Sequence, residues 1–264
     1  MKFEGDPITW HLEEGVGVIT LNRPEVYNAL NGEMGRSLME VLTEAASDAN
    51  VRALVITGAG KAFCSGQDLN DRSDPNIGNF SLGESVRERY NPLIRVLAEM
   101  EKPVIASVNG VAAGAGCSLA LACDLRIVSD RAKFVEAFVR IGLVPDSGSS
   151  WFLPRLIGFG RAMELLVTGR DVEAQEAVQI GLANQLVPHD RLTEESIALA
   201  RKLAQAPTRA IGWTKQALHQ SMESDLEEAL EREAQLQDRA GKTEDFREGV
   251  QAFVEKRSPR FQGK

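Results

Sequence analysis

An isolated carboxylate, Asp146, stands between a proline and a run of glycine and serine in the segment GLVPDSGSSWFLPRLIG, residues 142–158. A carboxylate held at a defined place can act as a general base and carry a proton between two atoms of a substrate. An acid followed by small residues and then an apolar run is also typical of a helix start, where the side chain caps the first turn. The residues of this segment alone leave both interpretations open.

Two glycine-bearing segments could supply a different kind of chemistry. They are GAGKAFCSGQDLND (residues 58–71) and VNGVAAGAGCSLALACD (residues 108–124), and each follows a β-rich run. Small residues let backbone N–H groups approach a ligand closely, so the pair could polarise one carbonyl oxygen from two sides. Taken singly, each segment is also typical of a tight turn or of close helix packing. Neither has the spacing of a dinucleotide or phosphate loop.

Other reactive residue types lack the partners that catalysis or metal binding needs. Cys64 and Ser65 lie beside the first glycine turn, but no histidine accompanies them in a nucleophile motif, so we expect them to pack. The three cysteines are odd in number and lack metal-ligand spacing, so we expect reduced thiols and no bound metal. The histidines have no paired acid nearby in the sequence and are interpreted as ordinary surface or core residues: His11, His189 and His219.

The elements that must position these residues follow from the hydrophobic pattern. Two strands around a glycine-containing turn are predicted in residues 8–22, and buried strands in 53–60, 103–110 and 125–130. Helical spacing marks residues 31–48, with Asn31 as the cap, and residues 85–101. This order of strand, helix and strand predicts right-handed crossovers and a largely parallel sheet. From about residue 160 onwards the pattern predicts successive helices and almost no strand.

Composition limits the class of protein. The chain has 264 residues, 43% of them hydrophobic, enough for one substantial core. A net charge of −8 and a pI near 5.1 argue against a general nucleic-acid surface. The amino-terminal stretch carries acids and a proline where a signal peptide needs an apolar core, and no apolar run is long enough to span a bilayer. We therefore expect a cytoplasmic protein without a nucleic-acid or membrane partner.

Five stretches, in order over nearly the whole chain, resemble the enoyl-CoA hydratase/isomerase (crotonase) superfamily: LNRPEVYNAL, GAGKAFCSGQDL, KPVIASVNGVAAGAGCSLALACDLRI, IGLVPDSGSSWFLPRLIG and REGVQAFVEKRSPRF. The resemblance implies an α/β crotonase fold with a ββα-superhelix core, expected over residues 1–200. It also implies a helical C-terminal trimerisation region, residues 201–264, that is not independent. A homotrimer or a dimer of trimers is expected. No cofactor is implied, because coenzyme A enters as part of an acyl-CoA substrate.

The resemblance also implies roles for individual residues. The backbone N–H groups of Gln67 and Ala115 would form the oxyanion hole that holds the thioester carbonyl and stabilises an enolate. Further residues would contact the coenzyme or the acyl group: Glu25 and Val26 along the coenzyme A chain, Phe253 and Lys256 at a neighbouring subunit's coenzyme A, and Tyr90 and Asn91 in the wall of the acyl pocket. The turn-rich segment 71–80 would border that pocket. For Phe253 and Lys256, an amphipathic helix with a packed Phe and a solvated Lys is an equal alternative.

The departures from the hydratase pattern point to the type of reaction. Hydratases of the family place glutamates at the positions of Ser118 and Phe138, and neither residue can act as a carboxylate base, so hydration should be slow. Family isomerases carry an acid at the position of Asp146, where one carboxylate suffices to move a proton between two carbons. Glu136 falls outside the matching glutamate position and is expected at most to support the site.

The stretches FCSGQDLNDR, YNPLIR and LVPDSG resemble family isomerases that act on ring-epoxidised phenylacetyl-CoA. The expected reaction is therefore conversion of ring-1,2-epoxyphenylacetyl-CoA to its oxepin isomer, together with movement of a 3,4-double bond of enoyl-CoA to the 2,3-position. Two alternatives remain open: an isomerase or hydratase of linear enoyl-CoA, and a crotonase-fold protein that binds RNA without catalysis. The acidic composition argues against the second.

Overall fold

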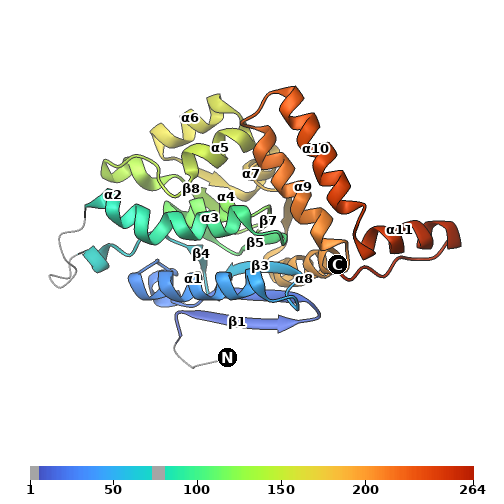
Figure 1. Ribbon diagram of the computed structural model, residues 1–264. Helices are drawn as coiled ribbons and strands as arrows, with labels where there is room; N and C mark the ends of the chain where they lie inside the picture. Colours follow the sequence, from blue (N-terminus) through green and yellow to red (C-terminus); the bar gives the residue numbers. More distant parts are fainter. Residues whose placement is uncertain (1–5, 73–80) are drawn as a thin grey trace.

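The computed structural model describes residues 6–72 and 81–264, and its centre is a twisted, mostly parallel sheet (Figure 1). Six described strands form it in the order β1-β2-β3-β5-β7-β10: β1 (Ile8–Glu13), β2 (Val16–Leu21), β3 (Ala53–Gly58), β5 (Val104–Val108), β7 (Leu125–Ser129) and β10 (Gln185–Val187). β1 and β2 form the predicted hairpin, whose turn residues Glu14 and Gly15 both have positive φ. The remaining pairs are parallel. The expectation of a largely parallel sheet is therefore confirmed.

A second, smaller sheet was not expected from the sequence. Four described strands form it in the order β4-β6-β8-β9: β4 (Ala62–Cys64), β6 (Val111–Ala113), β8 (Lys133–Val135) and β9 (Asp171–Glu173). β4, β6 and β8 are parallel, and β9 is antiparallel to β8. Each is three residues long, too short for a period-two pattern to show. A long strand, a short strand and a helix thus recur as β3-β4, β5-β6 and β7-β8 units, which is the ββα repeat that the resemblance implies.

Helices cover both faces of the six-stranded sheet. α1 (Gly32–Ser47) and α3 (Asn91–Glu99) pack on one face, and α8 (Leu192–Ala204) packs on the other. Asn31 caps α1 as predicted, because its side chain accepts a hydrogen bond of 2.9 Å from the Met34 N–H. The other described helices between β4 and β10 are α2 (Leu82–Ser85), α4 (Ala115–Ala122), α5 (Ser149–Ile157), α6 (Phe159–Thr168) and α7 (Ala174–Gln179). Shorter turns are η1 (Pro24–Val26), η2 (Leu69–Arg72), η3 (Val86–Tyr90), η4 (Ala137–Ile141) and η5 (His189–Arg191).

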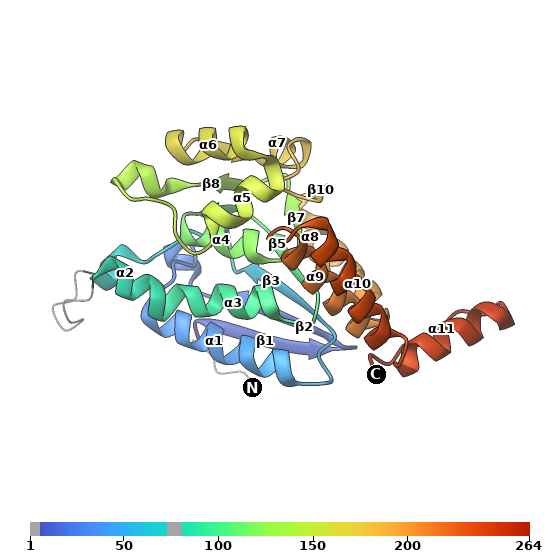
Figure 2. The ribbon, with the colours of Figure 1, turned by 45° about the horizontal axis from the view of Figure 1, so that its top comes forward.

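The C-terminal part is helical, as predicted, although the two short strands β9 and β10 interrupt the expected helical run. It contains α9 (Thr208–Ser221), α10 (Leu226–Ala240) and α11 (Glu244–Glu255). α9 and α10 pack against each other, whereas α11 projects from the body of the molecule in both views (Figures 1 and 2). The predicted boundary at residue 200 falls inside α8, which packs on the sheet, so the helices that extend beyond the core begin with α9.

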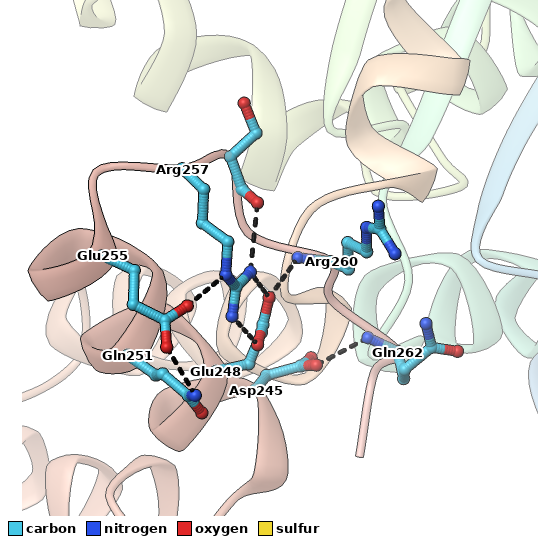
Figure 3. Close-up of polar contacts among 8 residues, drawn as sticks. Asp245, Glu248, Gln251, Glu255, Arg257, Arg260 and Gln262 are labelled. Atoms are coloured by element: carbon cyan, nitrogen blue, oxygen red, sulfur yellow. Dashed lines mark hydrogen bonds and ion pairs between the residues drawn. The ribbon is translucent and has the colours of Figure 1, made fainter.

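The C-terminal tail folds back along α11 and is held there by charged hydrogen bonds (Figure 3). The chain reverses at Lys256, which has left-handed backbone angles. Arg257 donates two parallel hydrogen bonds to Glu248, at 2.6 and 2.9 Å, and this guanidinium lowers the pKa of Glu248 to about 2. Further along, the Gln262 N–H donates to Asp245 at 2.6 Å. These bonds join the tail to α11 as one unit.

A buried amide joins the segment before α1 to the start of the second sheet. Asn28 has no exposed surface, and its Nδ2 donates to the carbonyls of Ala59 and Ala62 at 2.9 and 2.8 Å. Its Oδ1 accepts from the Arg23 N–H at 2.9 Å. Asn28 also has φ of 57°, a left-handed conformation that asparagine tolerates better than most residues. This side chain therefore sets where the β2–α1 connection lies relative to β4.

Replacing Asn28 by alanine should lower the free energy of unfolding by about 3 kcal/mol, because buried carbonyls lose their donors and alanine strains the left-handed backbone. Urea unfolding followed by circular dichroism measures the change. The matched control is Asn50→Ala, whose exposed side chain bonds only to Asp48; it should cost less than about 0.5 kcal/mol. Equal losses for the two variants would contradict the role of Asn28.

Candidate active site

The site lies where three parallel strands of the small sheet end side by side. β4, β6 and β8 are neighbours in that order, so their carboxyl ends meet at one edge. Gln67 lies three residues after β4, Ala115 two residues after β6, and Glu136 immediately after β8. Open parallel sheets bind ligands at this edge, since the loops that follow the strands converge there. The sheet order therefore brings together residues that are nearly 70 positions apart in the sequence.

The two glycine turns are in direct backbone contact. A Cβ atom on Gly66 would lie 2.8 Å from the Ala113 carbonyl oxygen and 3.5 Å from the Ala115 nitrogen. A Cβ atom on Gly116 would collide with the carbonyl group of Cys64. Only glycine allows this approach at either position. The structure thus places the backbone of Gly66–Gln67 against that of Ala113–Ala115, as an oxyanion hole formed by both turns requires.

Ala115 is the first residue of α4, so its N–H belongs to the helix turn whose donors have no acceptor within the helix. The residue before it, Gly114, has φ of 51° and ψ of −125°, angles that are open in practice only to glycine. The Gly114 N–H donates to the Val135 carbonyl at 2.9 Å, which ties the turn to β8. The positive end of the α4 dipole lies at this N–H and favours negative charge there.

The segment expected to contact coenzyme A runs beside the first turn. η1 carries Glu25, which is exposed, and Val26, which is half-buried. The Ser65 N–H donates to the Tyr27 carbonyl at 3.0 Å, and the Leu30 N–H donates to the Gly66 carbonyl at 2.7 Å. Glu25 and Val26 are therefore held next to the turn that carries Gln67.

Of the two residues assigned to the acyl pocket, Tyr90 is buried at the end of η3 and Asn91 is half-buried at the start of α3. Tyr90 lines a hollow of about 270 Å³ between α1 and α3 together with Leu30, whose backbone pairs with Gln67. The hollow therefore adjoins the turn that carries Gln67. Most of the predicted pocket segment 71–80 lies outside the described residues.

Asp146 comes to this edge in the loop before α5. The N-cap position of α5 is Gly148, two residues beyond Asp146, so Asp146 does not occupy the cap position that the capping interpretation expected. The turn is strained at Ser147, a residue with a side chain whose φ is 52°; the next residue, Gly148, has φ of 84°, which glycine adopts without strain. The Ser147 hydroxyl donates to Asp146 Oδ1 at 2.7 Å. A half-buried carboxylate presented by a strained turn is typical of a functional residue.

Two serine hydroxyls join Asp146 to the other strand ends. Ser118 Oγ, on α4, lies 3.1 Å from the Asp146 carbonyl oxygen and 2.8 Å from Ser149 Oγ. Ser149 Oγ in turn lies 3.0 Å from both carboxyl oxygens of Glu136. Ser118 stands where hydratases of the family have a glutamate, and Phe138, at the second glutamate position, is buried in η4. Neither position supplies a carboxylate.

Glu136 itself is only 3% exposed. Burial raises the pKa of Glu136 to about 7, opposed by hydrogen bonds from Cys117 and Ser149 and reinforced by the negative charge of Asp146. Cys117 donates its S–H to the Glu136 carboxyl, and burial raises the pKa of this thiol well above its ordinary value. Burial likewise raises the pKa of the Cys64 thiol to about 12, which suits the packing role expected for it rather than nucleophilic attack.

Two predicted coenzyme-binding residues lie apart from this site within the chain. Phe253 is 85% exposed on α11, and Lys256 ends the same helix. Figure 2 shows α11 directed away from the small sheet. The structure does not bring them near Glu25 or Ala115 of the same chain.

Comparison with known proteins decides the family. The sequence profile of the enoyl-CoA hydratase/isomerase family matches residues 11–264. The chain belongs to the enoyl-CoA hydratase/isomerase family. A curated relative, 1,2-epoxyphenylacetyl-CoA isomerase of Escherichia coli K12, is 48% identical over 96% of this chain and 97% of its own length. Another from the same organism, 2,3-dehydroadipyl-CoA hydratase, is 36% identical over 96% of this chain and 97% of its own length.

Solved structures agree with the family. The crystal structure of an enoyl-CoA hydratase from Bacillus anthracis has a TM-score of 0.90, with 37% identity over 98% of this chain and 100% of that one. The crotonase fold expected from the sequence is therefore confirmed. Across residues 6–72 and 81–264, no helix combines the length and apolar character needed to cross a membrane. The same ranges contain no group of three His, Cys, Asp or Glu side chains that could hold a metal ion.

Ser149 was not identified from the sequence as part of the site. Glu136 was expected only to support it, and its burial and contacts were not foreseen. Ser149 carries no motif of its own, and its contact with Glu136 spans thirteen residues. The short strand β8, which places Glu136 at the sheet edge, was itself not predicted. An acid directly after an apolar FV pair, at the same place in the ββα repeat as the two oxyanion turns, was the available signal.

Glu136→Gln should change how stability depends on pH. With its pKa raised from 4.5 to about 7, the folded protein keeps a proton that the unfolded chain releases over this interval. The stabilisation is therefore complete below the unfolded pKa and lost as pH rises through the folded pKa, by on the order of 3 kcal/mol. Urea unfolding at several pH values measures it.

The Glu136→Gln protein lacks this titration, so the wild type should lose stability relative to it between about pH 4.5 and about pH 7.5. Glu40→Gln, at an exposed position of α1, is the matched control and should follow the wild type. Parallel curves for the wild type and Glu136→Gln would contradict the raised pKa.

Proposed function

We propose that this protein is an acyl-CoA isomerase in which Asp146 is the single proton-carrying base. The observation that carries the proposal is the position of the acid at the strand ends, which differs from the positions of the hydratase glutamates. The two hydratase glutamate positions hold Ser118 and Phe138, while the Ser118 hydroxyl contacts the backbone of a different acid, Asp146, at 3.1 Å. One base can shuttle a proton between two carbons, whereas hydration also requires activation of a water molecule.

The proposed reaction uses the two turns and the acid together. The thioester carbonyl accepts hydrogen bonds from the N–H groups of Gln67 and Ala115, so negative charge on its oxygen is stabilised. Asp146 removes a proton from C2 of a 3-enoyl-CoA, and the electron pair of that C–H bond forms the enolate. The enolate then collapses with return of the proton from Asp146 to C4, which leaves a 2,3-double bond. The base ends in its starting state, and no further reactant is consumed.

The preferred substrate in this proposal is ring-1,2-epoxyphenylacetyl-CoA, converted to its oxepin isomer. Support comes from the 48% identity to an isomerase named for that acyl group, compared with 36% for the dehydroadipyl-CoA hydratase. The hollow beside the first turn is lined in part by Tyr90, Pro92, Leu93 and Met39, apolar side chains that an aromatic ring can contact. Linear enoyl-CoA isomerisation is the second reaction that the same site would support.

We also propose that α11 binds a second copy of this chain, in a trimer or a dimer of trimers. Its exposed apolar side chains lie at helical spacing and form one face: Phe246, Val250, Phe253 and Val254. Such a face on a projecting helix is costly unless covered. The charged bonds between the tail and α11 involve different residues and leave this face open. Phe253 and Lys256 would thereby reach the coenzyme A of the neighbouring subunit.

Asp146→Asn tests the function. The variant should bind acyl-CoA while kcat for isomerisation of a 3-enoyl-CoA falls by about a hundredfold or more, because asparagine cannot accept the proton. Its free energy of unfolding should change by no more than about 1 kcal/mol, since the amide oxygen still accepts from Ser147 and no helix cap is lost. Asp130→Asn, exposed at the opposite end of β8, is the matched control and should keep wild-type kcat.

The wild-type protein should in addition isomerise the 3-enoyl-CoA much faster than it hydrates crotonyl-CoA. Comparable hydration would overturn the isomerase assignment in favour of a hydratase, and a variant at position 146 with most of its kcat would remove Asp146 from the reaction.

Gly114→Ala tests the oxyanion turn. A Cβ at this position meets no atom within 4 Å, so only the backbone conformation is disturbed. Because φ of 51° strains alanine, the turn should relax and move the Ala115 N–H, and kcat should fall by about tenfold to a hundredfold. Gly160→Ala in α6 also meets no atom within 4 Å and should keep wild-type kcat with slightly higher thermal stability. Wild-type turnover of a folded Gly114→Ala protein would count against the assignment.

A further inference from the structure

Glu136 is a buried carboxyl at the site that takes no part in the proposed proton transfer. Ser149 and Cys117 occupy its oxygens, and the side chain is almost wholly shielded, so it does not touch a substrate. Its position directly after β8 nevertheless places it level with both oxyanion turns. A carboxyl buried beside a second acid is costly unless it is hydrogen-bonded, so the groups that bond to Glu136 are central to its role.

The hydroxyls of Ser118 and Ser149 form a chain of hydrogen bonds beside Glu136. These bonds can be donated towards Glu136 or away from it, and each hydroxyl has one proton to donate. At one end stand the carbonyl oxygens of Asp146 and Gly114, which only accept, at 3.1 and 3.2 Å from Ser118 Oγ. If Ser118 donates to these carbonyls, its bond to Ser149 must be donated by Ser149. Ser149 then has no proton left for Glu136, so Glu136 must be the donor.

The protonated carboxyl satisfies this requirement. One of its oxygens donates to Ser149, and the other accepts from Cys117. An ionised Glu136 reverses the chain, because Ser149 must then donate to the carboxylate and Ser118 must donate to Ser149. The Asp146 carbonyl loses the Ser118 hydrogen bond in that state.

We propose that Glu136 is a positioning residue that acts, when protonated, through two serine hydroxyls to hold the Asp146 turn against the first turn of α4. Its ionisation reverses the hydroxyl chain and releases the turn. This inference rests on the proposed role of Asp146. The strained turn needs such a restraint, since Ser147 has positive φ and α5 has no side-chain cap. Small displacements of a base reduce turnover strongly.

The surroundings of Glu136 favour the protonated form near neutral pH. Burial raises its pKa to about 7, so the proposed switch falls within a range in which the protein can be assayed. Cys117 of α4 and Asp146 are the titratable groups that act on it directly. Charged side chains on the elements packed around β8 are engaged elsewhere: Arg140 with Asp171, Lys133 with Glu173, Arg170 with Glu164 and Glu176, and buried Arg126 with the carbonyls of Cys123 and Leu182.

The test is the pH dependence of kcat in three proteins, measured with a 3-enoyl-CoA. In the wild type, kcat should fall by about tenfold as pH rises through the Glu136 titration, while KM stays within about twofold. Glu136→Gln has an amide that donates to Ser149 at every pH, so its kcat should match the wild type at low pH and stay constant above neutrality. Ser118→Ala removes the hydroxyl that donates to the Asp146 carbonyl and should show the low kcat at all pH values.

Ser196→Ala is the matched control, because it removes a buried serine–serine hydrogen bond of 2.9 Å, to Ser107, on the far side of the sheet. It should keep the wild-type pH profile with a comparable loss of thermal stability. A Glu136→Gln profile that follows the wild type, or a Ser118→Ala protein with wild-type kcat, overturns the inference. Ser118→Ala decides the matter if Glu136→Gln does not fold.

A second readout separates this inference from the proposed function. Hydrogen exchange of the backbone amides of residues 146–149, compared at the same pH, should be faster in the wild type than in Glu136→Gln above neutrality and equal below it. Equal exchange at every pH overturns the positioning role. If Asp146→Asn keeps its turnover, the proposed base is wrong, whereas the exchange comparison still decides whether Glu136 holds the turn.

Discussion

The contact between the start of α4 and the turn that follows β4 is the constraint on which the site depends. The two backbone segments meet at Gly66 and Gly116. They lie so close that a Cβ atom on either residue would collide with the other segment. Two elements far apart in the sequence can present N–H groups to one oxygen only if nothing separates them. The parallel pairing of β4 with β6 brings the two segments to this distance. Asn28 ties the connection between β2 and α1 to β4. The ββα repeat thus serves to align strand ends.

Acids at these strand ends differ because their surroundings differ. Asp146 is half-buried in a strained turn near the start of α4, so part of its side chain is exposed, as the proposed base requires. Glu136 is enclosed by α4, β8 and α5, where burial favours the neutral acid. Two carboxyls close together separate into different roles when one is desolvated and the other is not. Ser118 links the two acids, because its hydroxyl lies within hydrogen-bond distance of both the Asp146 carbonyl and Ser149 Oγ.

The same scaffold carries proteins named as isomerases and as hydratases, so the fold does not decide the reaction. In the proposed function, the donors for the thioester carbonyl are backbone groups of the turns that follow β4 and β6. Side chains at the ends of β6 and β8 and in the loop before α5 then determine where a proton can go. In this chain Ser118 follows β6, Phe138 follows β8 and Asp146 lies in the loop before α5.

The long elements could be predicted from the sequence alone, because their hydrophobic periodicity and end signals are local. The β1–β2 hairpin, the strands β3, β5 and β7, the Asn31 cap of α1 and the C-terminal helices are all of this kind. The glycines of the two turns and the acid at position 146 were visible for the same reason, although their joint meaning came from the resemblance. The second sheet was not predictable from periodicity, since strands of three residues give no repeating pattern.

Only the tertiary structure decided what the polar residues do. Asp146 could have capped α5, and the sequence is equally typical of that role, but the chain turns through Ser147 and Gly148 before the helix begins. Whether Glu136 is ionised depends on how much water surrounds it, and that depends on α4 and α5 closing over β8. Hydrogen bonds between Ser118, Ser149 and Glu136 join three separate elements. Such contacts depend on packing at long range, which leaves no periodic trace in the order of the residues.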